Sequence, residues 1–548
     1  MPKIKKYHIL FVLLLILNLG VAIYHLAHKE GWHVDEQYSY GHANSTTGAY
    51  LGKHIDSFRN DVQHELYDQW QDSKIFHDYL TVQKGEQFAF GSVYENMKMS
   101  VHPPLYFMLL HAVCSFTPDV FSPWQGGSIN LIAFLFTLIV FYKLSRLFIK
   151  NEYLAMIPVF LWGFSEAGLS TVLFLRVYML LVLFAVCLLY EVMLVLLENR
   201  LGKKRSCLIF LFTTLGVLTH YNFLVFDFFL ACIGGLILML RKEYKMMFSL
   251  SVVQIIGISM LFLFFSPALR VLFHSYDGAT SVSILHTLLT KVNFDVIKSY
   301  LLYDNSHIFA IYVRTLLGIS ENYYEYMFWL VIFVGIILWY KKGQLPKGFW
   351  VLCLLFFLMA WYIHMFMPFM VGFLRYLMVV MPLATLILVI WFSCFFECFR
   401  MRLKWILFFW IAVVILVGGF LKWKNCTYSV YVSDETKRTL QIMEKHDVLV
   451  AGFPKTFFDA IYVYPLFNRV YLANISDNPN WSGELEKADY LMFFNQYAQD
   501  KNFLMVPRKL RIDDRIEDKL SYISTIRAGI VFFDVYKVNK DGENAYKN

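Results

Sequence analysis

The chain has 548 residues, of which 58% are hydrophobic and 16% are charged, and its mean hydropathy is +0.51. A soluble protein with a buried core and a polar surface does not need so many apolar residues, so the composition predicts a polytopic α-helical membrane protein. The net charge of +8 does not indicate a nucleic-acid partner, because the basic residues lie in short clusters between apolar segments rather than along one face or tail.

The first apolar segment, residues 8–26, is about 19 residues long and can cross the hydrocarbon layer. It follows Lys3, Lys5 and Lys6 and therefore resembles the start of a signal peptide, but no small-residue cleavage site follows it at residues 28–30. We expect a retained signal anchor with a cytoplasmic amino terminus.

Further apolar segments bring the predicted number of spans to about eleven. With the amino terminus inside, all the loops rich in lysine and arginine fall on the cytoplasmic side, as the positive-inside rule requires. The predicted spans after the first are residues 125–142, 154–172, 177–197, 207–219, 224–240, 247–266, 326–340, 349–367, 374–396 and 405–421.

One apolar segment, residues 103–116, is not counted as a span. Its apolar part covers only about 12 residues, which is too short to cross, and Pro103 and Pro104 favour the start of a helix. Counting it would place every later basic cluster outside. We therefore predict a helix in the membrane interface.

Three outward segments are long enough to carry function: residues 27–127, 267–325 and 422–548. The first is expected to contain juxtamembrane helices around residues 50–80. The tail alternates polar helical stretches with apolar strands, which predicts an extracytoplasmic α/β domain for acceptor recognition or assembly. The predicted domains are residues 1–424, which include outer loop 27–127, and residues 425–548; the predicted strands are residues 448–452, 470–473, 490–494 and 530–538.

The strongest local signal is the pair Asp35 and Glu36, directly after the first span. Near lipid headgroups, a carboxylate can deprotonate an acceptor hydroxyl or amine, or can hold a divalent cation against a phosphate. The alternative is a structural one, because acidic residues are also favoured in the first turn of a helix.

Four further motifs fall at predicted outer ends of helices. His102 precedes the two prolines and can donate to a phosphate or act as an acid. Arg176 and Tyr178 lie among apolar residues, where an arginine either extends to the headgroups or pairs with a lipid-linked phosphate. Their shared outer location predicts a polar pocket for an anionic substrate, completed by His220, Tyr221, Arg375 and Tyr376.

The order of these motifs resembles that of the GT-C glycosyltransferase superfamily. It is similar to its bacterial protein O-mannosyltransferase-like and lipid A aminoarabinose-transferase-like members, within the dolichyl-phosphate-mannose-protein mannosyltransferase family. The resemblance covers about the first 400 residues. The sequence departs from the eukaryotic mannosyltransferases after Leu105, where Tyr106 and Phe107 replace the usual Gly-Lys.

The resemblance implies transfer of a sugar from a polyprenyl-phosphate carrier to an extracytoplasmic protein, lipid or cell-envelope glycan, at the plasma membrane of a bacterium. Asp35 would act as the base or bind a divalent metal ion, and Glu36 would assist it. Arg176 or Arg375 would contact the carrier phosphate, while His102 and Tyr221 would shape the site.

Two other functions remain open. A transporter or flippase for polyprenyl lipids or envelope polymers would also use cations within the membrane, but it would need a polar path to the inner leaflet. An envelope assembly or receptor protein would bind through the carboxy-terminal domain and would not need Asp35 and Glu36.

Overall fold

The computed structural model describes residues 5–51, 66–273, 316, 324–340, 345–366, 374–420, 432–475, 481–494, 519–528 and 531–539. The chain forms two compact units. The membrane unit consists of Met1–Ala27, Val101–Tyr106 and Gly127–Thr427, and the sheet unit consists of His28–Ser100, Phe107–Gly126 and Tyr428–Asn548. Most of the predicted outer segment 267–325 lies outside the described residues.

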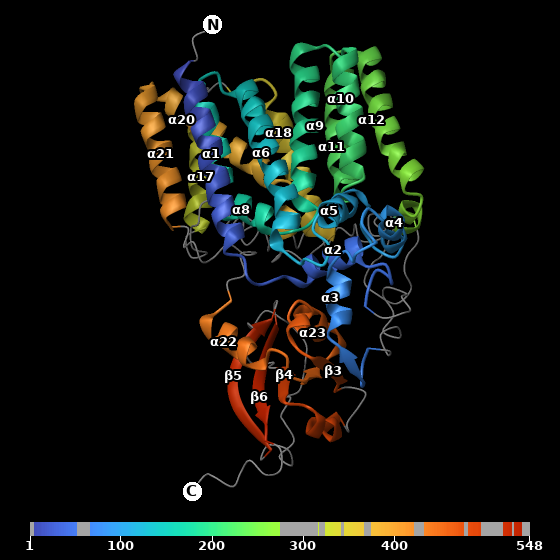
Figure 1. The fold of residues 1–548 in the computed structure, drawn as a ribbon. Coiled ribbons are helices and arrows are strands. Elements are labelled where there is room, and N and C mark those ends of the chain that lie inside the picture. The colour runs from blue at the N-terminus through green and yellow to red at the C-terminus, as the bar shows by residue number, and fades with distance from the viewer. Residues whose placement is uncertain are drawn as a thin grey trace. The chain divides into compact units, whose positions relative to one another are not determined.

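The membrane unit is helical throughout its described part (Figure 1). Each predicted span coincides with one or more helices. These are α1 (Lys6–Ala27), α6 (Pro123–Phe148), η2 (Leu154–Met156), α7 (Ile157–Gly163), α8 (Glu166–Leu173), α9 (Tyr178–Glu198), α10 (Lys203–Val217), α11 (Asn222–Leu240), α12 (Tyr244–Phe264), α17 (Tyr324–Tyr340), α18 (Phe349–Phe366), α19 (Leu374–Leu377), α20 (Met381–Cys398) and α21 (Leu403–Phe420). The short helix α13 (Ala268–Phe273) lies at the start of the predicted outer segment 267–325.

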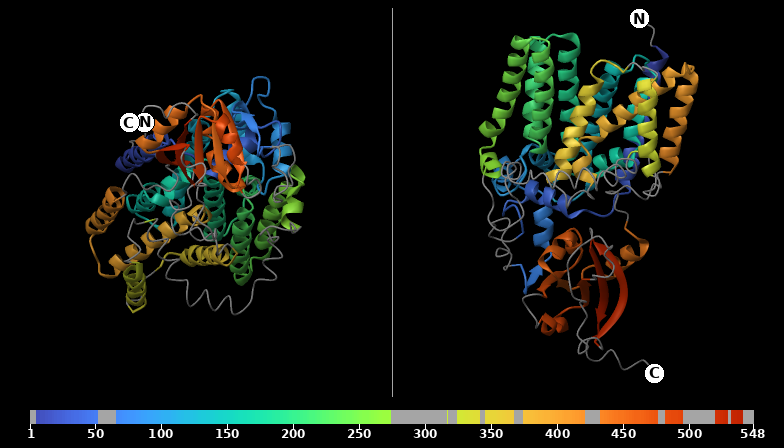
Figure 2. Two further views of the ribbon diagram at one scale, coloured as in Figure 1. Left: turned by 90° about the horizontal axis from the view of Figure 1, so that it is seen from below. Right: turned by 180° about the vertical axis from the view of Figure 1, so that it is seen from behind.

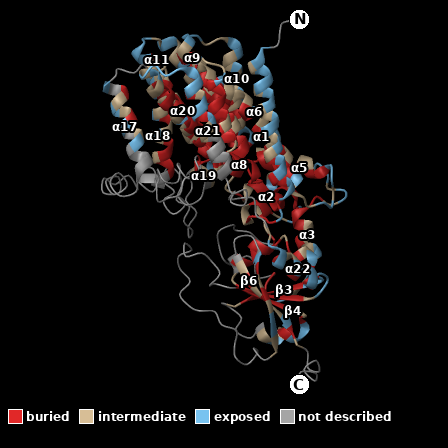
Figure 3. Ribbon diagram, turned by 90° about the vertical axis from the view of Figure 1, so that its left-hand side faces the viewer, coloured by how far each residue is buried: buried red, intermediate tan, exposed pale blue. Residues whose placement is uncertain are grey.

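Six of the helices in the described residues are long and apolar enough to cross a membrane, and a seventh span results if one bent pair is counted as one. The prediction of a polytopic helical membrane protein is thereby confirmed, while the number of about eleven spans stays a prediction. Figure 3 shows exposed residues along α1, where Ile16 is 60% exposed and Leu17 55%; such apolar exposure fits a lipid-facing helix.

The predicted span 154–172 is not one straight helix, because Leu154–Gly163 and Glu166–Leu173 meet at 56°. Ser165 has an extended backbone, and its side chain accepts a hydrogen bond from the amide of Gly168, so it starts a new helix. At Gly168 a Cβ atom would lie 2.1 Å from the Trp162 carbonyl oxygen. The bend therefore requires glycine at this position.

Helices α9 to α12 pack side by side, with α10 in contact with α9, α11 and α12 (Figures 1 and 2). Within this group the Gln254 Nε2 atom donates a hydrogen bond of 2.6 Å to Asp227 Oδ1, which joins α12 to α11. Helix α20 contacts α17 and α18, and these yellow and orange helices face the viewer in the right-hand view of Figure 2.

The sheet unit contains a six-stranded sheet with the order β1-β3-β2-β4-β6-β5. Strand β2 runs parallel to β3 and β4, and the remaining pairs are antiparallel. The core of the sheet includes Leu449, Leu491 and Phe493, which are almost fully buried. The strands are β1 (Trp70–Asp72), β2 (Val448–Gly452), β3 (Arg469–Asn474), β4 (Tyr490–Phe494), β5 (Leu520–Ala528) and β6 (Val531–Val538).

The helices of the sheet unit come from both ends of the chain. They are α2 (Val34–Asn44), α3 (Lys74–Leu80), α4 (Phe90–Lys98), α5 (Leu105–Ser115), α22 (Asp434–Met443), α23 (Pro454–Phe457), η6 (Phe458–Ala460), η7 (Tyr464–Leu466) and η8 (Trp481–Lys487). Helix α5 begins in the membrane unit and corresponds to the predicted interfacial helix 103–116. Ser433 caps α22 by accepting from the Thr436 amide, as its sequence position indicated.

The first outer loop supplies a strand to the sheet, which corrects part of the sequence prediction. Juxtamembrane helices were expected around residues 50–80. Lys74–Leu80 form the helix α3, but Trp70–Asp72 form β1, and residues 52–65 lie outside the described residues. Trp70 pairs with Tyr471, and its indole nitrogen donates to Glu484 Oε2 at 3.0 Å. Long-range strand pairing joins loop 28–100 to the tail, which begins at Tyr428 in the sheet unit, and the division of the chain at residues 424–425 stays a prediction.

The predicted topology can be tested with single cysteines in a cysteine-free background. We expect Asp434→Cys to react with a membrane-impermeant thiol reagent in intact cells, and Lys203→Cys to react only after permeabilisation. Both positions are exposed, and the Asp434 side chain is 89% exposed. Labelling of position 434 only after permeabilisation would contradict the outward location of the tail.

Candidate functional site

A polar cluster lies at the helix ends of the membrane unit, with Arg176 at its centre. Arg176 sits between α8 and α9 and is 6% exposed. Its Nη2 atom lies 2.8 Å from Nε2 of His102. Because a guanidinium can only donate, His102 Nε2 must accept, so this imidazole is neutral and carries its proton on Nδ1. Both residues were predicted from the sequence to line a pocket for an anionic substrate, and the structure brings them into contact.

His220 joins the same cluster from the connection between α10 and α11. Its ring centroid lies 5.3 Å from that of His102 and 5.5 Å from that of Tyr178. Its Nδ1 atom accepts a hydrogen bond of 3.0 Å from the Asn222 amide, which places the proton on Nε2. Burial lowers the pKa of His220 to about 3, and the charge of Arg176 acts in the same direction. His220 is therefore a neutral N–H donor near pH 7.

The Nε2 atom of His220 is buried and has no hydrogen-bond partner within the described part of the chain. A buried donor without an acceptor costs about 1 to 3 kcal/mol. A ligand oxygen at this position would remove that cost, so the cluster is a candidate binding site for an oxygen-rich anion.

Hydrogen bonds to backbone carbonyls fix the segments that carry this cluster. The Leu105 amide donates to the Leu218 carbonyl at 3.1 Å, which ties the start of α5 to the connection that carries His220. Asn130 on α6 donates to the carbonyls of Val172 and Phe174, each at 2.8 Å, and so fixes the chain just before Arg176. The site is thus built on helix ends rather than on free loops.

The other predicted residues of the membrane unit lie as follows. Tyr178 begins α9 and stacks on Phe174 with ring centroids 5.5 Å apart. Tyr221 is buried directly before α11. Arg375 on α19 is half-buried, and its guanidinium carbon lies 5.0 Å from the ring centre of Tyr376.

The carboxylate pair Asp35 and Glu36 belongs to the sheet unit, in the first turn of α2. The two side chains have different environments. Glu36 Oε2 accepts a 2.8 Å hydrogen bond from the His33 amide and lies 3.1 Å from Lys29 Nζ, and both charged side chains are fully buried. Burial lowers the pKa of Lys29, while Glu36 acts in the opposite direction. Glu36 therefore caps and anchors the helix.

Asp35 is the accessible carboxylate of the pair. Its side chain is 23% exposed, and its Oδ2 atom lies 3.7 Å from Nδ1 of His33. The Asp35 amide also donates to this nitrogen at 3.1 Å. The positive end of the α2 dipole favours the ionised form of Asp35. This arrangement supports a chemical role for Asp35 and a structural role for its neighbour.

The structure offers little support for a metal ion at Asp35. No group of three or more His, Cys, Asp and Glu residues suited to a metal occurs in the described ranges. Asp35 and His33 provide two donor groups, and the ammonium of Lys29 beside Glu36 would repel a cation. We therefore derive no catalytic step through a metal.

No sequence motif marks Lys29, Gln37 or Asn130, although their contacts hold the segments that carry the candidate site residues. The spacing of His33 and Glu36 was a usable signal, because it matches that of a capping box. The partners of Gln37 and Asn130 lie far away in sequence, so no local pattern could have revealed them.

Comparison with known proteins finds no matching family model and no matching curated protein. The chain is similar to several solved structures. An Archaeoglobus fulgidus oligosaccharyltransferase complex with Zn and sulfate shares 10% identity, with a TM-score of 0.48 over 88% of this chain and 68% of that chain. ArnT from Cupriavidus metallidurans bound to undecaprenyl phosphate shares 8% identity, with a TM-score of 0.39 over 96% and 97% of the two chains.

A third similar structure is Archaeoglobus fulgidus AglB in complex with an inhibitory peptide and a dolichol-phosphate. It shares 10% identity, with a TM-score of 0.45 over 88% of this chain and 69% of that chain.

Removing the charge of Glu36 should destabilise the sheet unit. We expect Glu36→Gln to lower the free energy of unfolding by about 3 to 5 kcal/mol, because the buried ammonium of Lys29 loses its counter-ion. Thermal unfolding of the purified protein would measure the change.

Two variants serve as controls for this prediction. Asp35→Asn, at the adjacent and partly exposed position, should lower the free energy of unfolding by less than about 1 kcal/mol. Adding Lys29→Met to Glu36→Gln should recover part of the loss, because the buried ammonium is then absent as well. Equal destabilisation by Asp35→Asn and Glu36→Gln would contradict the different roles of the two residues.

Proposed function

We propose that this chain is a membrane glycosyltransferase that moves a sugar from a polyprenyl-phosphate carrier to an extracytoplasmic acceptor. The observation that carries the proposal is the cluster of Arg176, His102 and His220, in which a buried cation lies beside an N–H donor without an acceptor among the described residues. A phosphate has the negative charge and the acceptor oxygens that this cluster can bind.

The cluster suits a phosphate that is also a leaving group. When the bond between the sugar C1 and the phosphate oxygen breaks, the carrier phosphate keeps the electron pair and gains negative charge. Arg176 and the Nε2–H of His220 then bind the departing phosphate more strongly than the donor, which lowers the barrier. Polyprenyl phosphates of this class are bound in the AglB and ArnT structures described above.

Asp35 is proposed as the general base. As the acceptor hydroxyl or amine forms its new bond to C1, its proton passes to the Asp35 carboxylate. Asp35 and the Arg176 cluster are assigned to one reaction because the order of the motifs resembles that of the GT-C enzymes. Arg375 remains the alternative phosphate contact, with Tyr178, Tyr221 and Tyr376 as further substrate-binding residues. The proposed location is the outer face of a bacterial plasma membrane.

Loss of the Arg176 side chain should weaken donor binding. We expect Arg176→Ala to raise the Kd for polyprenyl phosphate by about 10- to 100-fold, because a charge-assisted hydrogen bond contributes about 1.5 to 3 kcal/mol. Arg176→Lys should retain part of the affinity, since it keeps the charge but not the planar donor geometry. Binding can be measured with the protein in lipid nanodiscs.

The same measurement on Arg375→Ala decides between the two phosphate contacts. Lys203→Ala, which removes an exposed cation at the start of α10, is the control for a general charge effect. Unchanged binding by folded Arg176→Ala together with a large loss in Arg375→Ala would transfer the phosphate contact to Arg375.

Substitution of Asp35 should abolish transfer and leave donor binding intact. Asp35→Asn keeps the shape of the side chain but removes its basicity, so we expect a fall in kcat of about 100-fold or more. Release of carrier phosphate, with a panel of polyprenyl-phosphate sugars and candidate acceptors, is the measurement. Full activity of folded Asp35→Asn would rule out the proposed base.

Addition of a chelator separates the two roles that the sequence left open for Asp35. A base predicts activity that persists in chelator and changes with pH, whereas a metal ligand predicts loss of activity that added divalent ions restore. Chelator-sensitive activity would overturn the assignment of Asp35 as a simple base.

A further inference from the structure

Gln37 connects the helix of Asp35 to the carboxy-terminal part of the sheet unit. Its Nε2 atom donates to the carbonyl of Asp459 at 2.9 Å, and its Oε1 atom accepts from the amide of Tyr462 at 2.9 Å. The side chain is fully buried. Both contacts bridge more than four hundred residues of sequence, so they exist only in the folded unit.

A neutral amide suits this position because it presents one donor and one acceptor on the same planar group. The segment 458–462 begins with the short helix η6 and presents the Asp459 carbonyl and the Tyr462 amide to the Gln37 side chain. A carboxylate could accept from the Tyr462 amide but would repel the Asp459 carbonyl. An apolar side chain would leave both backbone groups without these partners, which is costly for buried groups.

Further contacts hold the two ends of α2. At its start, Glu36 is held by Lys29 and the His33 amide. At its end, Asn96 donates to the carbonyls of His42 and Ser45.

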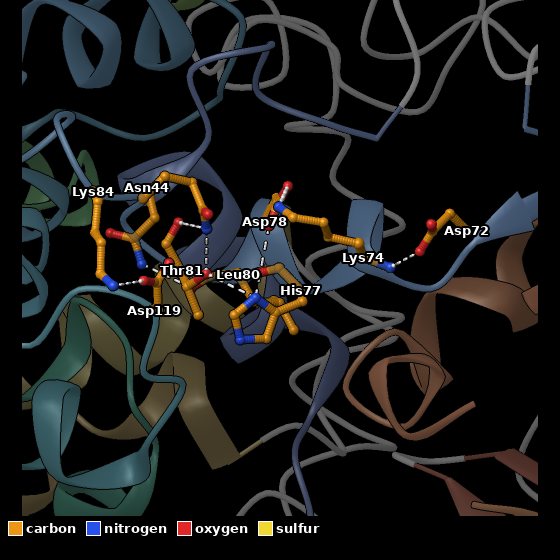
Figure 4. Close-up of polar contacts among 10 residues, drawn as sticks. Asn44, Asp72, Lys74, His77, Asp78, Leu80, Thr81, Lys84 and Asp119 are labelled. Carbon is orange, nitrogen blue, oxygen red and sulfur yellow. Dashed lines mark hydrogen bonds and ion pairs between the residues drawn. The ribbon is translucent and has the colours of Figure 1, made fainter. Parts of the chain in front are cut away.

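Helix α3 adds a second anchor at the end of α2. Asn44 donates to the Leu80 carbonyl at 2.8 Å, as the close-up in Figure 4 shows, and a Cβ atom at Gly41 would lie 1.9 Å from the Tyr79 ring. Gln37 thus links the first half of the helix to the carboxy-terminal domain by hydrogen bonds, beside the ring contact of Tyr38 with Phe458.

We propose that Gln37 is a positioning residue, through which the carboxy-terminal α/β domain holds α2 so that Asp35 keeps the geometry needed for proton transfer. This inference rests on the proposed function of Asp35. It gives the carboxy-terminal domain a part in catalysis besides the acceptor recognition or assembly expected from the sequence. A general base works only within hydrogen-bond reach of the proton, and a misplacement of about 1 Å can reduce the rate about 100-fold.

The test compares two substitutions in the full-length protein. Gln37→Met keeps the length of the side chain and loses both hydrogen bonds, and Gln37→Glu keeps only the bond from Tyr462. Trp70→Phe is the matched control, because it removes the hydrogen bond to Glu484 that joins the same two chain segments at β1, away from α2. Turnover, donor KM and hydrogen exchange of the α2 amides are measured for each variant.

We expect both Gln37 variants to lower kcat by about tenfold or more, to leave the donor KM within about twofold and to speed exchange in α2. Trp70→Phe should change neither kcat nor exchange in α2. Unchanged kcat in Gln37→Glu and Gln37→Met, or an equal loss in Trp70→Phe, would overturn the positioning role.

Hydrogen exchange of the α2 amides tests this inference separately from the proposed function. If the parent protein transfers no sugar from any donor, the proposed function fails, and exchange alone then decides whether Gln37 holds the helix. Unchanged exchange in α2 would overturn the inference in that case too. If Gln37→Met does not fold, Gln37→Glu provides both measurements.

Discussion

A guanidinium buried at the ends of apolar helices is the constraint around which the membrane unit is organised. Arg176 loses most of its hydration there, and such a loss has to be offset by polar contacts. The neutral imidazole of His102 accepts from it, and the bend at Ser165 together with the Asn130 contacts fixes the chain on its approach. Burial, and after it the charge of Arg176, lowers the pKa of His220 and keeps this histidine neutral and able to donate. The cation thus fixes the tautomer of His102 and adds to the effect of burial on His220.

The two adjacent carboxylates of α2 show how burial divides the roles of residues that look equivalent in sequence. A fully buried carboxylate needs a counter-ion and hydrogen bonds, and Glu36 has both in Lys29 and the His33 amide. Asp35, one residue earlier, points to a different side of the helix and keeps some exposure. A buried ion pair is too constrained to exchange protons with a substrate, so the accessible carboxylate is the better base.

The sheet unit is assembled from segments that the membrane unit separates in sequence. Strand β1 pairs with β3, Gln37 binds the segment 458–462, and Glu30 accepts hydrogen bonds from Val432 and Lys437. The exposed ion pair to Lys437 contributes little by itself. Strand pairing and buried hydrogen bonds define the unit, and they make the first outer loop and the tail one structural element. A tail that held the catalytic helix in place would be part of the enzyme rather than an accessory domain.

The sequence by itself determined the membrane character, the position of each apolar helix and most strands of the tail, because hydropathy and alternation are local properties. It also named the residues that meet at Arg176, since a histidine or arginine within an apolar segment is conspicuous. Tertiary structure alone decided that the span 154–172 is bent, that Trp70–Asp72 is a strand and that Glu36 is buried against Lys29 while Asp35 is partly exposed. These outcomes depend on partners distant in sequence, such as Tyr471 for Trp70, or on burial that composition does not specify. No local sequence pattern indicates the role of Gln37 either, because its two partners come close to it only when the chain folds.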